Sequence, residues 1–272
     1  MAAARIPVHY QVLGSGPKTV LFFHGWAMDG NSWLPLVKQF PREGWRLVMP
    51  DLRGFGRSGK PTHGYHIDDY MRDAIRLIRE LGVRQVNVVG HSFGGTGALY
   101  LAARVPHLVR RLVVLDTIPG AANPHISPLI ARQFSRVRVL VQRTTSEQLA
   151  TLLMRIWRQS FVKGPTDEIT ALQRTAVEEA QPHAILATLN TILTTDIGAW
   201  LNRVRVPTLV VQGSEDPVLH GGSDGLLNLK AERLVVPGVG HYPQLEVPDM
   251  LFNYLLSFLG PAGSSRFPSA ET

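Results

Sequence analysis

Residues 86–95 read VNVVGHSFGG, and residues 96–103 continue as TGALYLAA. The first part is rich in β-branched residues, as a buried strand is, and the last part consists of good helix formers. Between them lies a Gly-x-Ser-x-Gly pattern, with Ser92 at its centre. A sharp turn between a strand and a helix projects a serine hydroxyl from the end of the sheet, and the glycines leave room for the closely packed backbone. The pattern therefore predicts that Ser92 is a nucleophile.

Three other motifs fit their usual chemistry poorly. A dinucleotide-binding Gly-x-Gly-x-x-Gly that starts at Gly95 has Tyr100 where the last glycine belongs. A P-loop that starts at Gly54 has Pro61 where the magnesium-binding Ser or Thr belongs, and breakers follow it. The pair His63 and His66 lies in a loop without a third ligand, so we interpret both as surface histidines. We expect neither a cofactor nor a metal.

Composition indicates an ordinary globular protein. The chain has 272 residues, of which 44% are apolar and 18% charged, enough for one large α/β domain with an insertion. It has no cysteine, no signal-peptide pattern and no apolar run of membrane-spanning length, so we expect a cytoplasmic protein with no membrane partner. The formal charge of +7 comes without a nucleic-acid-binding motif, and we expect no nucleic-acid partner.

Strand-like stretches alternate with helical ones along most of the chain. Besides the stretch before Ser92, strands are predicted at residues 6–13, 19–23, 45–51, 111–116, 206–213 and 233–237. Helices are predicted from Ser32 to about Gln39, from Asp68 or Asp69 to about Leu81, after Ser92, and over 249–259. This alternation predicts a mostly parallel sheet with helices on both faces.

One long segment breaks the alternation. From residue 118 to 202 the pattern is helical throughout, with helices expected over 127–143, 145–161, 166–180, 182–194 and 196–203. We interpret residues 119–202 as a helical cap inserted into an α/β core formed by residues 1–118 and 203–260. The tail, 261–272, is expected to be disordered.

A serine hydroxyl needs a base to take its proton, and the base needs a partner that fixes its tautomer. Both are expected at the carboxyl ends of later strands. Asp216 follows the strand 206–213, and His241 follows the strand 233–237 in a glycine-rich loop. We therefore predict a catalytic triad of Ser92, Asp216 and His241. Glu215 and Asp116 remain open as alternatives for the acid.

Two backbone N–H groups are expected to form an oxyanion hole. One belongs to Phe93, which follows the nucleophile, and the other to Trp26, in the loop after the first long buried strand. The substrate pocket is predicted to be lined by residues of these loops and of the cap, which favours a hydrophobic acyl or aromatic group. The predicted lining consists of Trp26, His91, Phe134, Leu153, Trp157, Ile192 and Tyr242.

Taken together, these motifs resemble the α/β-hydrolase superfamily over residues 6 to about 260. The matching pieces are His24-Gly25-Trp26, the loop 51–58, the stretch 90–95, Gly213-x-x-Asp216 and Gly240-His241. The resemblance implies an eight-stranded, mostly parallel sheet and a helical cap. The chain is most similar to the small capped branch that includes carboxylesterases, cofactor-free haloperoxidases, meta-cleavage C–C hydrolases and pimeloyl-carrier-protein methyl esterases. Epoxide hydrolases and haloalkane dehalogenases share the style of the 53–58 loop but use an aspartate nucleophile, so Ser92 argues against both.

The resulting hypothesis is a serine hydrolase that cleaves a carboxylic ester through an acyl-enzyme. The same triad could instead serve a C–C bond hydrolase, a lactonase or a biosynthetic cyclase or lyase, because this fold hosts many chemistries. A ligand receptor that kept the fold is the alternative outside catalysis.

The expected partner is a small-molecule ester, with the protein a monomer or homodimer. Four arginines in the first expected cap helix are a candidate docking site for an acidic carrier protein: Arg132, Arg136, Arg138 and Arg143.

Overall fold

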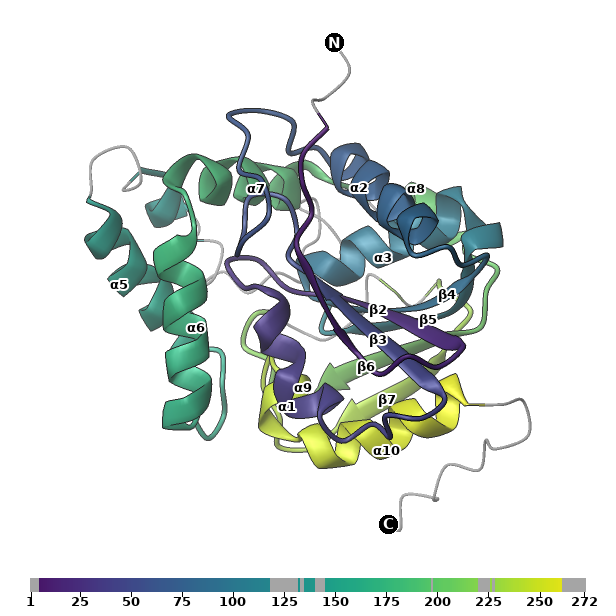
Figure 1. Cartoon of the computed structure of the whole chain (residues 1–272). Coiled ribbons are helices and arrows are strands. Elements are labelled where there is room, and N and C mark those ends of the chain that lie inside the picture. The colour runs from purple at the N-terminus through teal and green to yellow at the C-terminus, as the bar shows by residue number, and fades with distance from the viewer. Residues whose placement is uncertain are drawn as a thin grey trace.

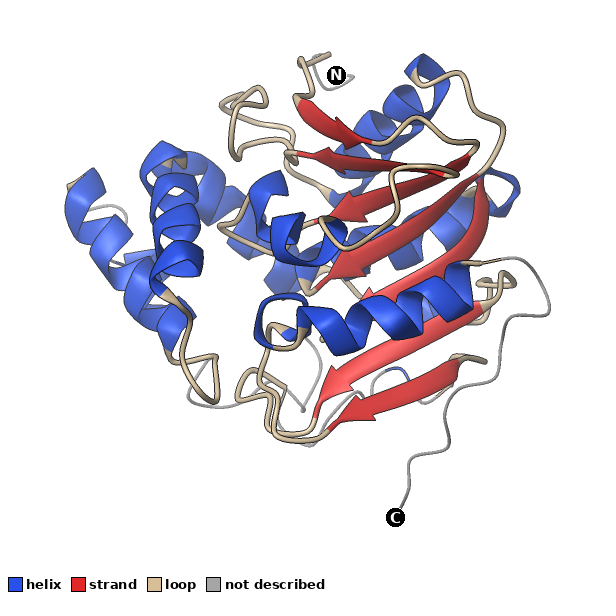
Figure 2. Ribbon diagram, turned by 60° about the horizontal axis from the view of Figure 1, so that its bottom comes forward, coloured by secondary structure: helices blue, strands red, loops and turns tan. Residues whose placement is uncertain are grey.

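The computed structural model describes residues 5–117, 132, 135–139, 145–196, 198–219, 226 and 228–260. Its centre is a sheet of seven strands in the order β1-β3-β2-β4-β5-β6-β7 (Figures 1 and 2). The strands are β1 Tyr10–Leu13, β2 Lys18–Phe23, β3 Trp45–Pro50, β4 Val86–His91, β5 Val109–Leu115, β6 Thr208–Gly213 and β7 Glu232–Val236. Only β1 runs antiparallel to its neighbour, β3; the other strands pair in parallel. The α/β fold with a mostly parallel sheet is confirmed.

The described chain contains seven strands where the superfamily resemblance implied eight. The sequence patterns predict seven strands, and each of them corresponds to one observed strand. The first is shorter than predicted, because the ladder with β3 begins only at Tyr10.

Strand direction determines where the functional loops lie. The strands β4, β5, β6 and β7 are adjacent and parallel, so their carboxyl ends meet at one edge of the sheet. Ser92, Asp116, Asp216 and His241 all come after these ends. The sheet therefore brings together residues that are up to 149 positions apart in the chain.

Helices cover both faces of the sheet (Figure 2). One face is covered by α1 (Leu34–Val37) and α10 (Pro248–Leu259), and the other by α2 (Ile67–Glu80), α3 (Phe93–Arg104) and α8 (Gly198–Leu201). Short helical turns complete the core: η1 Gly30–Trp33, η2 Pro106–Leu108 and α9 Pro243–Glu246.

Successive side chains along a strand point to opposite faces of the sheet, which explains why helices cover both faces. On β2, Val20 and Phe22 pack with α1 and α10, whereas Leu21 and Phe23 pack with α2 and α3. All four side chains are buried, as expected for a strand of a parallel sheet that is covered on both sides.

Three further helices lie over the carboxyl edge of the sheet, at the left of Figure 1: α5 (Ser146–Arg158), α6 (Asp167–Glu179) and α7 (Pro182–Thr194). An apolar layer joins them to the loops of the core, with side chains such as Met28, Phe93 and Trp157. Polar contacts reinforce this layer. The Gln173 side chain donates to the Ala27 carbonyl at 2.8 Å, and the Tyr70 and Thr188 hydroxyls are 2.7 Å apart.

The helix starts show which residues act as caps. Thr145 and Thr166 accept hydrogen bonds from Gln148 N and Ile169 N, so α5 and α6 begin one residue after the predicted positions. The start of α2 differs from the prediction, because His66 occupies the N-cap and Asp69 accepts from its backbone N–H.

The predicted helix at 127–143 lies mostly outside the described residues; positions 135–139 are helical. Among the described helices, none has the length and hydropathy that crossing a membrane requires.

Candidate active site

Ser92 occupies the turn between β4 and α3 in a strained conformation. Its φ is +52° and its ψ is −118°, a region that non-glycine residues rarely adopt. The Ser92 N–H donates to the Leu115 carbonyl at 2.8 Å, which ties the turn to the end of β5. The surrounding structure therefore holds the serine at the position that the sequence predicted.

The two glycines of the pattern are required by packing. A Cβ atom on Gly94 would lie 2.2 Å from the Phe23 carbonyl oxygen, and one on Gly90 would lie 2.5 Å from the Gly94 carbonyl oxygen. Both obstacles are backbone atoms, which cannot rotate away. Any side chain at these positions would push α3 away from β2 or open the turn.

His241 lies beside Ser92 in the loop after β7. Its Nε2 atom is 3.0 Å from the Ser92 hydroxyl oxygen, and its Nδ1 atom is 2.8 Å from Asp216 Oδ2. Because an ionised carboxylate only accepts, Nδ1 carries the proton and Nε2 is left to accept from the serine. The backbone N–H of His241 donates to the Ser160 carbonyl at 2.9 Å, so α5 and its following turn help to fix the loop.

Asp216 is buried and held by several donors. Besides His241, the N–H groups of Val218 and Leu219 donate to its Oδ1 atom at 2.7 and 3.2 Å. Burial alone would raise the pKa of Asp216, but the neighbouring His241 and these hydrogen bonds outweigh it and lower the pKa below its ordinary value. Of the two alternative acids, Glu215 is exposed, whereas Asp116 is buried next to Asp216.

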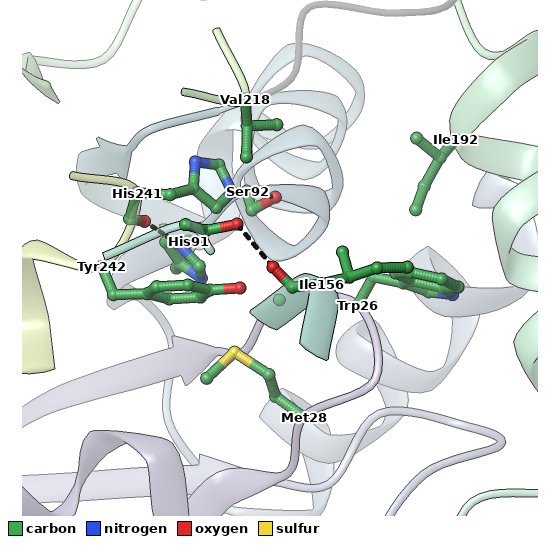
Figure 3. A pocket seen from close by; sticks show the side chains of 11 residues that line it. Trp26, Met28, His91, Ser92, Ile156, Ile192, Val218, His241 and Tyr242 are labelled. Atoms are coloured by element: carbon green, nitrogen blue, oxygen red, sulfur yellow. Dashed lines mark hydrogen bonds between the residues drawn. The ribbon is translucent and has the colours of Figure 1, made fainter. Parts of the chain in front are cut away.

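A cavity opens in front of this array (Figure 3). Its volume is about 430 Å³, including the open mouth. Four residues of the predicted pocket line it: Trp26, His91, Ile192 and Tyr242. Sequence reasoning missed Met28, Ile156, Ser160 and Val218, which also line it. Figure 3 shows Ser92 and His241 on one side, with Trp26 and Ile192 facing them across the cavity. The wall is mainly apolar.

Two of the remaining predicted pocket residues lie elsewhere. Leu153 and Trp157 are buried in the apolar layer under α5 and do not line this cavity. Ile156 takes that place, because it points to the cavity from the same helix. Phe134 lies outside the described residues. Of the four arginines expected in the first cap helix, Arg132, Arg136 and Arg138 are exposed, and Arg143 also lies outside the described residues.

The loop after β2 is held rigidly by His24. Its Nδ1–H donates to the Gly25 carbonyl at 2.8 Å, and its Nε2 accepts from the Leu52 N–H at 2.8 Å. Burial lowers the pKa of His24 to about 4, so the ring stays neutral and keeps both bonds. Trp26 follows, and its indole N–H donates to the Ile185 carbonyl of α7 at 3.2 Å. Phe93 is the first residue of α3, where backbone N–H groups lack an intrahelical acceptor.

Known proteins with similar sequences and structures exist. A family profile described as the alpha/beta hydrolase fold matches residues 18–248. A non-heme haloperoxidase from Rhodococcus erythropolis is 27% identical over 93% of this chain and 95% of its own length. A bifunctional esterase/perhydrolase from Acinetobacter calcoaceticus is 25% identical over 93% of this chain and 96% of its own.

Among solved structures, a bromoperoxidase from Bacillus anthracis superimposes with a TM-score of 0.83 at 22% identity, and the match covers 94% of this chain and 96% of that one. At this level of identity the structural likeness establishes the fold. The family profile extends over most of the chain, from β2 to the start of α10. The chain belongs to the α/β-hydrolase fold family.

Proposed function

We propose that this protein is a serine hydrolase that cleaves a carboxylic ester of a small hydrophobic acyl or aromatic substrate. The observation that carries the proposal is the continuous array from Asp216 through His241 to Ser92, with spacings of 2.8 and 3.0 Å, at the wall of an apolar cavity. Several relatives are named for ester hydrolysis, including the esterase/perhydrolase described above.

In this mechanism His241 Nε2 removes the Ser92 proton as the hydroxyl oxygen attacks the ester carbonyl. Asp216 holds the ring in the tautomer that leaves Nε2 free of hydrogen, and it stabilises the imidazolium that forms. The leaving alcohol takes its proton from Nε2. Water then repeats the sequence on the acyl-enzyme, with His241 again as the base, and releases the carboxylic acid.

We assign the oxyanion hole to the backbone N–H groups of Phe93 and Trp26. Phe93 begins α3, so the positive end of the helix dipole also favours negative charge there. Trp26 lies in the loop that His24 holds in place, and the next residue, Ala27, has a φ of +56°. Removing one such donor typically costs about 3–4 kcal/mol of transition-state stabilisation.

We also propose that α5, α6 and α7 act as a cap over the carboxyl edge of the sheet. Ile156 on α5 and Ile192 on α7 line the cavity. The side chains of these helices therefore limit the length and shape of the acyl group that can bind. The apolar wall favours hydrocarbon and aromatic groups over charged ones.

The decisive experiment measures hydrolysis of p-nitrophenyl esters of increasing acyl length by the wild type and by Ser92→Ala. We expect turnover by the wild type and a loss of about 10⁴–10⁶-fold in the variant. A fluorophosphonate should label the wild type at Ser92 and leave the variant unlabelled. An alanine variant with nearly full turnover would refute the assignment of Ser92.

A lack of turnover on every ester would also distinguish between the alternative functions. Labelling without turnover of any ester would mean an active nucleophile with a different substrate, and C–C cleavage and lactone substrates would then be assayed. A folded wild type that is neither labelled nor active would contradict the proposal as a whole and favour a ligand receptor or a cyclase.

A further inference from the structure

A second carboxyl group is buried directly behind the triad acid. Asp116 follows β5, the strand between those that precede Ser92 and Asp216. Its side chain is only 1% exposed. Its backbone N–H donates to the Val211 carbonyl at 3.0 Å, and its φ of +38° is unusual for a residue with a Cβ atom. The end of the strand thus holds this carboxyl group inside the protein despite a conformational cost.

The two oxygens of Asp116 have different surroundings. Oδ1 accepts a hydrogen bond from the Gly213 N–H at 2.9 Å. Oδ2 is fully buried, and no N–H or O–H donor of the described residues reaches it. The Asp116 carboxyl group also lies close to the triad, because one side-chain ligand atom each from Asp116, Asp216 and His241 lies within 4.8 Å of the other two.

Two buried carboxyl groups this close do not both ionise, because like charges repel strongly in a poorly solvated site. The hydrogen bonds decide which one carries the charge. Asp216 accepts from the Val218 and Leu219 N–H groups and from His241, whereas Asp116 accepts from one N–H group. The negative charge therefore resides on Asp216, and the proton resides on Asp116.

We propose that Asp116 is a neutral carboxylic acid that donates the proton on Oδ2 in a hydrogen bond to Asp216, and that it acts as a positioning residue for the triad. The role rests on the proposed serine-hydrolase function; the protonation state itself does not. Among the described residues no hydrogen bond joins Asp116 to the nucleophile's hydroxyl, so it acts through Asp216 and His241.

The charged surroundings agree with this assignment. Burial raises the pKa of Asp116 well above its ordinary value, and the Asp216 carboxylate and the more distant Glu246 raise it further. The Gly213 N–H acts in the opposite direction but does not compensate. The proposed hydrogen bond between the two acids would also act to lower the pKa of Asp216.

The neutral acid has two consequences for the triad. It supplies one more donor to the Asp216 carboxylate, which restrains the orientation of the oxygen that holds His241 Nδ1. It also disperses part of the carboxylate charge, so that Asp216 stabilises the imidazolium of His241 less than an isolated carboxylate would. Removing Asp116 would therefore leave more negative charge on the Asp216 oxygen that faces His241.

The first test compares the pH dependence of kcat/KM on a p-nitrophenyl ester for the wild type and Asp116→Asn. The asparagine amide can still donate to Asp216 and accept from Gly213, and asparagine tolerates a positive φ. If Asp116 is neutral, the acid limb of the profile stays at the same pH. If Asp116 is ionised, the substitution removes a negative charge near His241 and moves that limb down by about one pH unit, which would overturn the proposal.

The second test uses Asp116→Ala, which removes the hydrogen-bond donor to Asp216 that Asp116→Asn retains. We expect kcat to fall by about 10–100-fold with a smaller change in KM, and the acid limb to move to higher pH. Asp116→Asn should recover most of the lost kcat. A purely structural role predicts instead that both variants change thermal stability and leave the acid limb unchanged. Equal losses of kcat in the two variants would also contradict the proposal.

Infrared difference spectroscopy tests the protonation state without any activity. At about pH 8, where ordinary carboxyl groups are ionised, the wild type should retain a carboxylic C=O stretching band that shifts in D₂O and disappears in Asp116→Asn. A missing band would refute the neutral acid. A band present in a protein that hydrolyses no ester would support the acid pair and refute only the proposed function.

Discussion

The Nε2–H group of His91 donates a hydrogen bond of 2.7 Å to the backbone carbonyl of His241. The residue before the nucleophile thus holds the main chain of the base, across 150 positions of sequence. The two imidazole rings are also close, with centroids 5.0 Å apart. Burial, and then the neighbouring His241, lower the pKa of His91 well below its ordinary value. His91 therefore remains neutral and keeps the tautomer that makes this bond.

Replacing His91 by phenylalanine tests this contact, because the ring remains and the donor is lost. The carbonyl of His241 would then be buried without a partner, which costs about 1–3 kcal/mol. We expect kcat on a p-nitrophenyl ester to fall by about tenfold, with a smaller change in KM, and the thermal unfolding midpoint to fall. His63→Phe, at an exposed loop position, is the matched control. If kcat and the unfolding midpoint of His91→Phe equal those of the wild type, the contact has no role.

The identity of the acid is tested by Asp216→Asn and Glu215→Gln. The amide at 216 can present N–H to His241, which favours the tautomer that cannot accept the Ser92 proton, so kcat should fall by about 10⁴-fold at neutral pH. Glu215 is exposed, and its substitution should leave kcat unchanged. Similar losses in both variants would mean that the loop conformation, and not the carboxylate, is what matters.

Gly94→Ala tests the packing of the turn, with Gly97→Ala as its control on the same helix. A Cβ atom at position 94 would lie 2.2 Å from the Phe23 carbonyl oxygen, whereas one at 97 would meet nothing within 4 Å. We expect Gly94→Ala to lower the unfolding midpoint strongly and to abolish turnover. Gly97→Ala should stabilise α3 by about 0.5–1 kcal/mol. Equal effects on stability would contradict the packing argument.

Much of the fold could be predicted from local signals. The bounds of α7 agree with the prediction at both ends, because Pro182 is favoured in the first turn of a helix. The start of the first helix differs from the prediction. Ser32 was expected to cap it, but the Asp29 carboxylate accepts from the Asn31 N–H at 2.8 Å and starts a 3₁₀ turn three residues earlier. Ser32 instead donates its hydroxyl proton to the Asp29 carbonyl.

The triad residues follow from chain order and strand ends, but the cavity wall does not follow from the sequence. Helical periodicity shows that one face of α5 is buried without showing which neighbour each side chain meets. Trp157 is predicted to line the substrate pocket, yet its ring packs against Phe161, with centroids 4.8 Å apart. Its neighbour Ile156 lines the cavity. The crossing of α5 over the loops decides this, and it depends on tertiary packing.

Ile192→Phe tests whether α7 limits the acyl group. Ile192 lines the cavity opposite Ser92 (Figure 3), so a larger side chain should reduce the space for long acyl chains. We expect the preferred p-nitrophenyl ester to become shorter, with kcat/KM for the longest substrates reduced by about 10-fold or more and that for acetate nearly unchanged. Val162→Phe, at a side chain that is 40% exposed, is the control. An unchanged chain-length profile would mean that the acyl group binds elsewhere.

Asp29 should make the free energy of unfolding depend on pH, and a single substitution can test its contribution. Burial, followed by the nearby Asp51, raises the pKa of Asp29 to about 6, above the unfolded value of about 4. Its burial as a neutral acid therefore contributes stability that is fully present below about pH 4 and is lost as the pH rises through about 6. Asp29→Asn cannot ionise and still accepts from the Asn31 N–H. Relative to the wild type, this variant should become more stable between about pH 4 and about pH 7, by no more than about 3 kcal/mol. Urea unfolding at both pH values measures the change, and Glu43→Gln, at an exposed carboxyl, is the control. A difference in stability that does not vary with pH would show that Asp29 titrates normally.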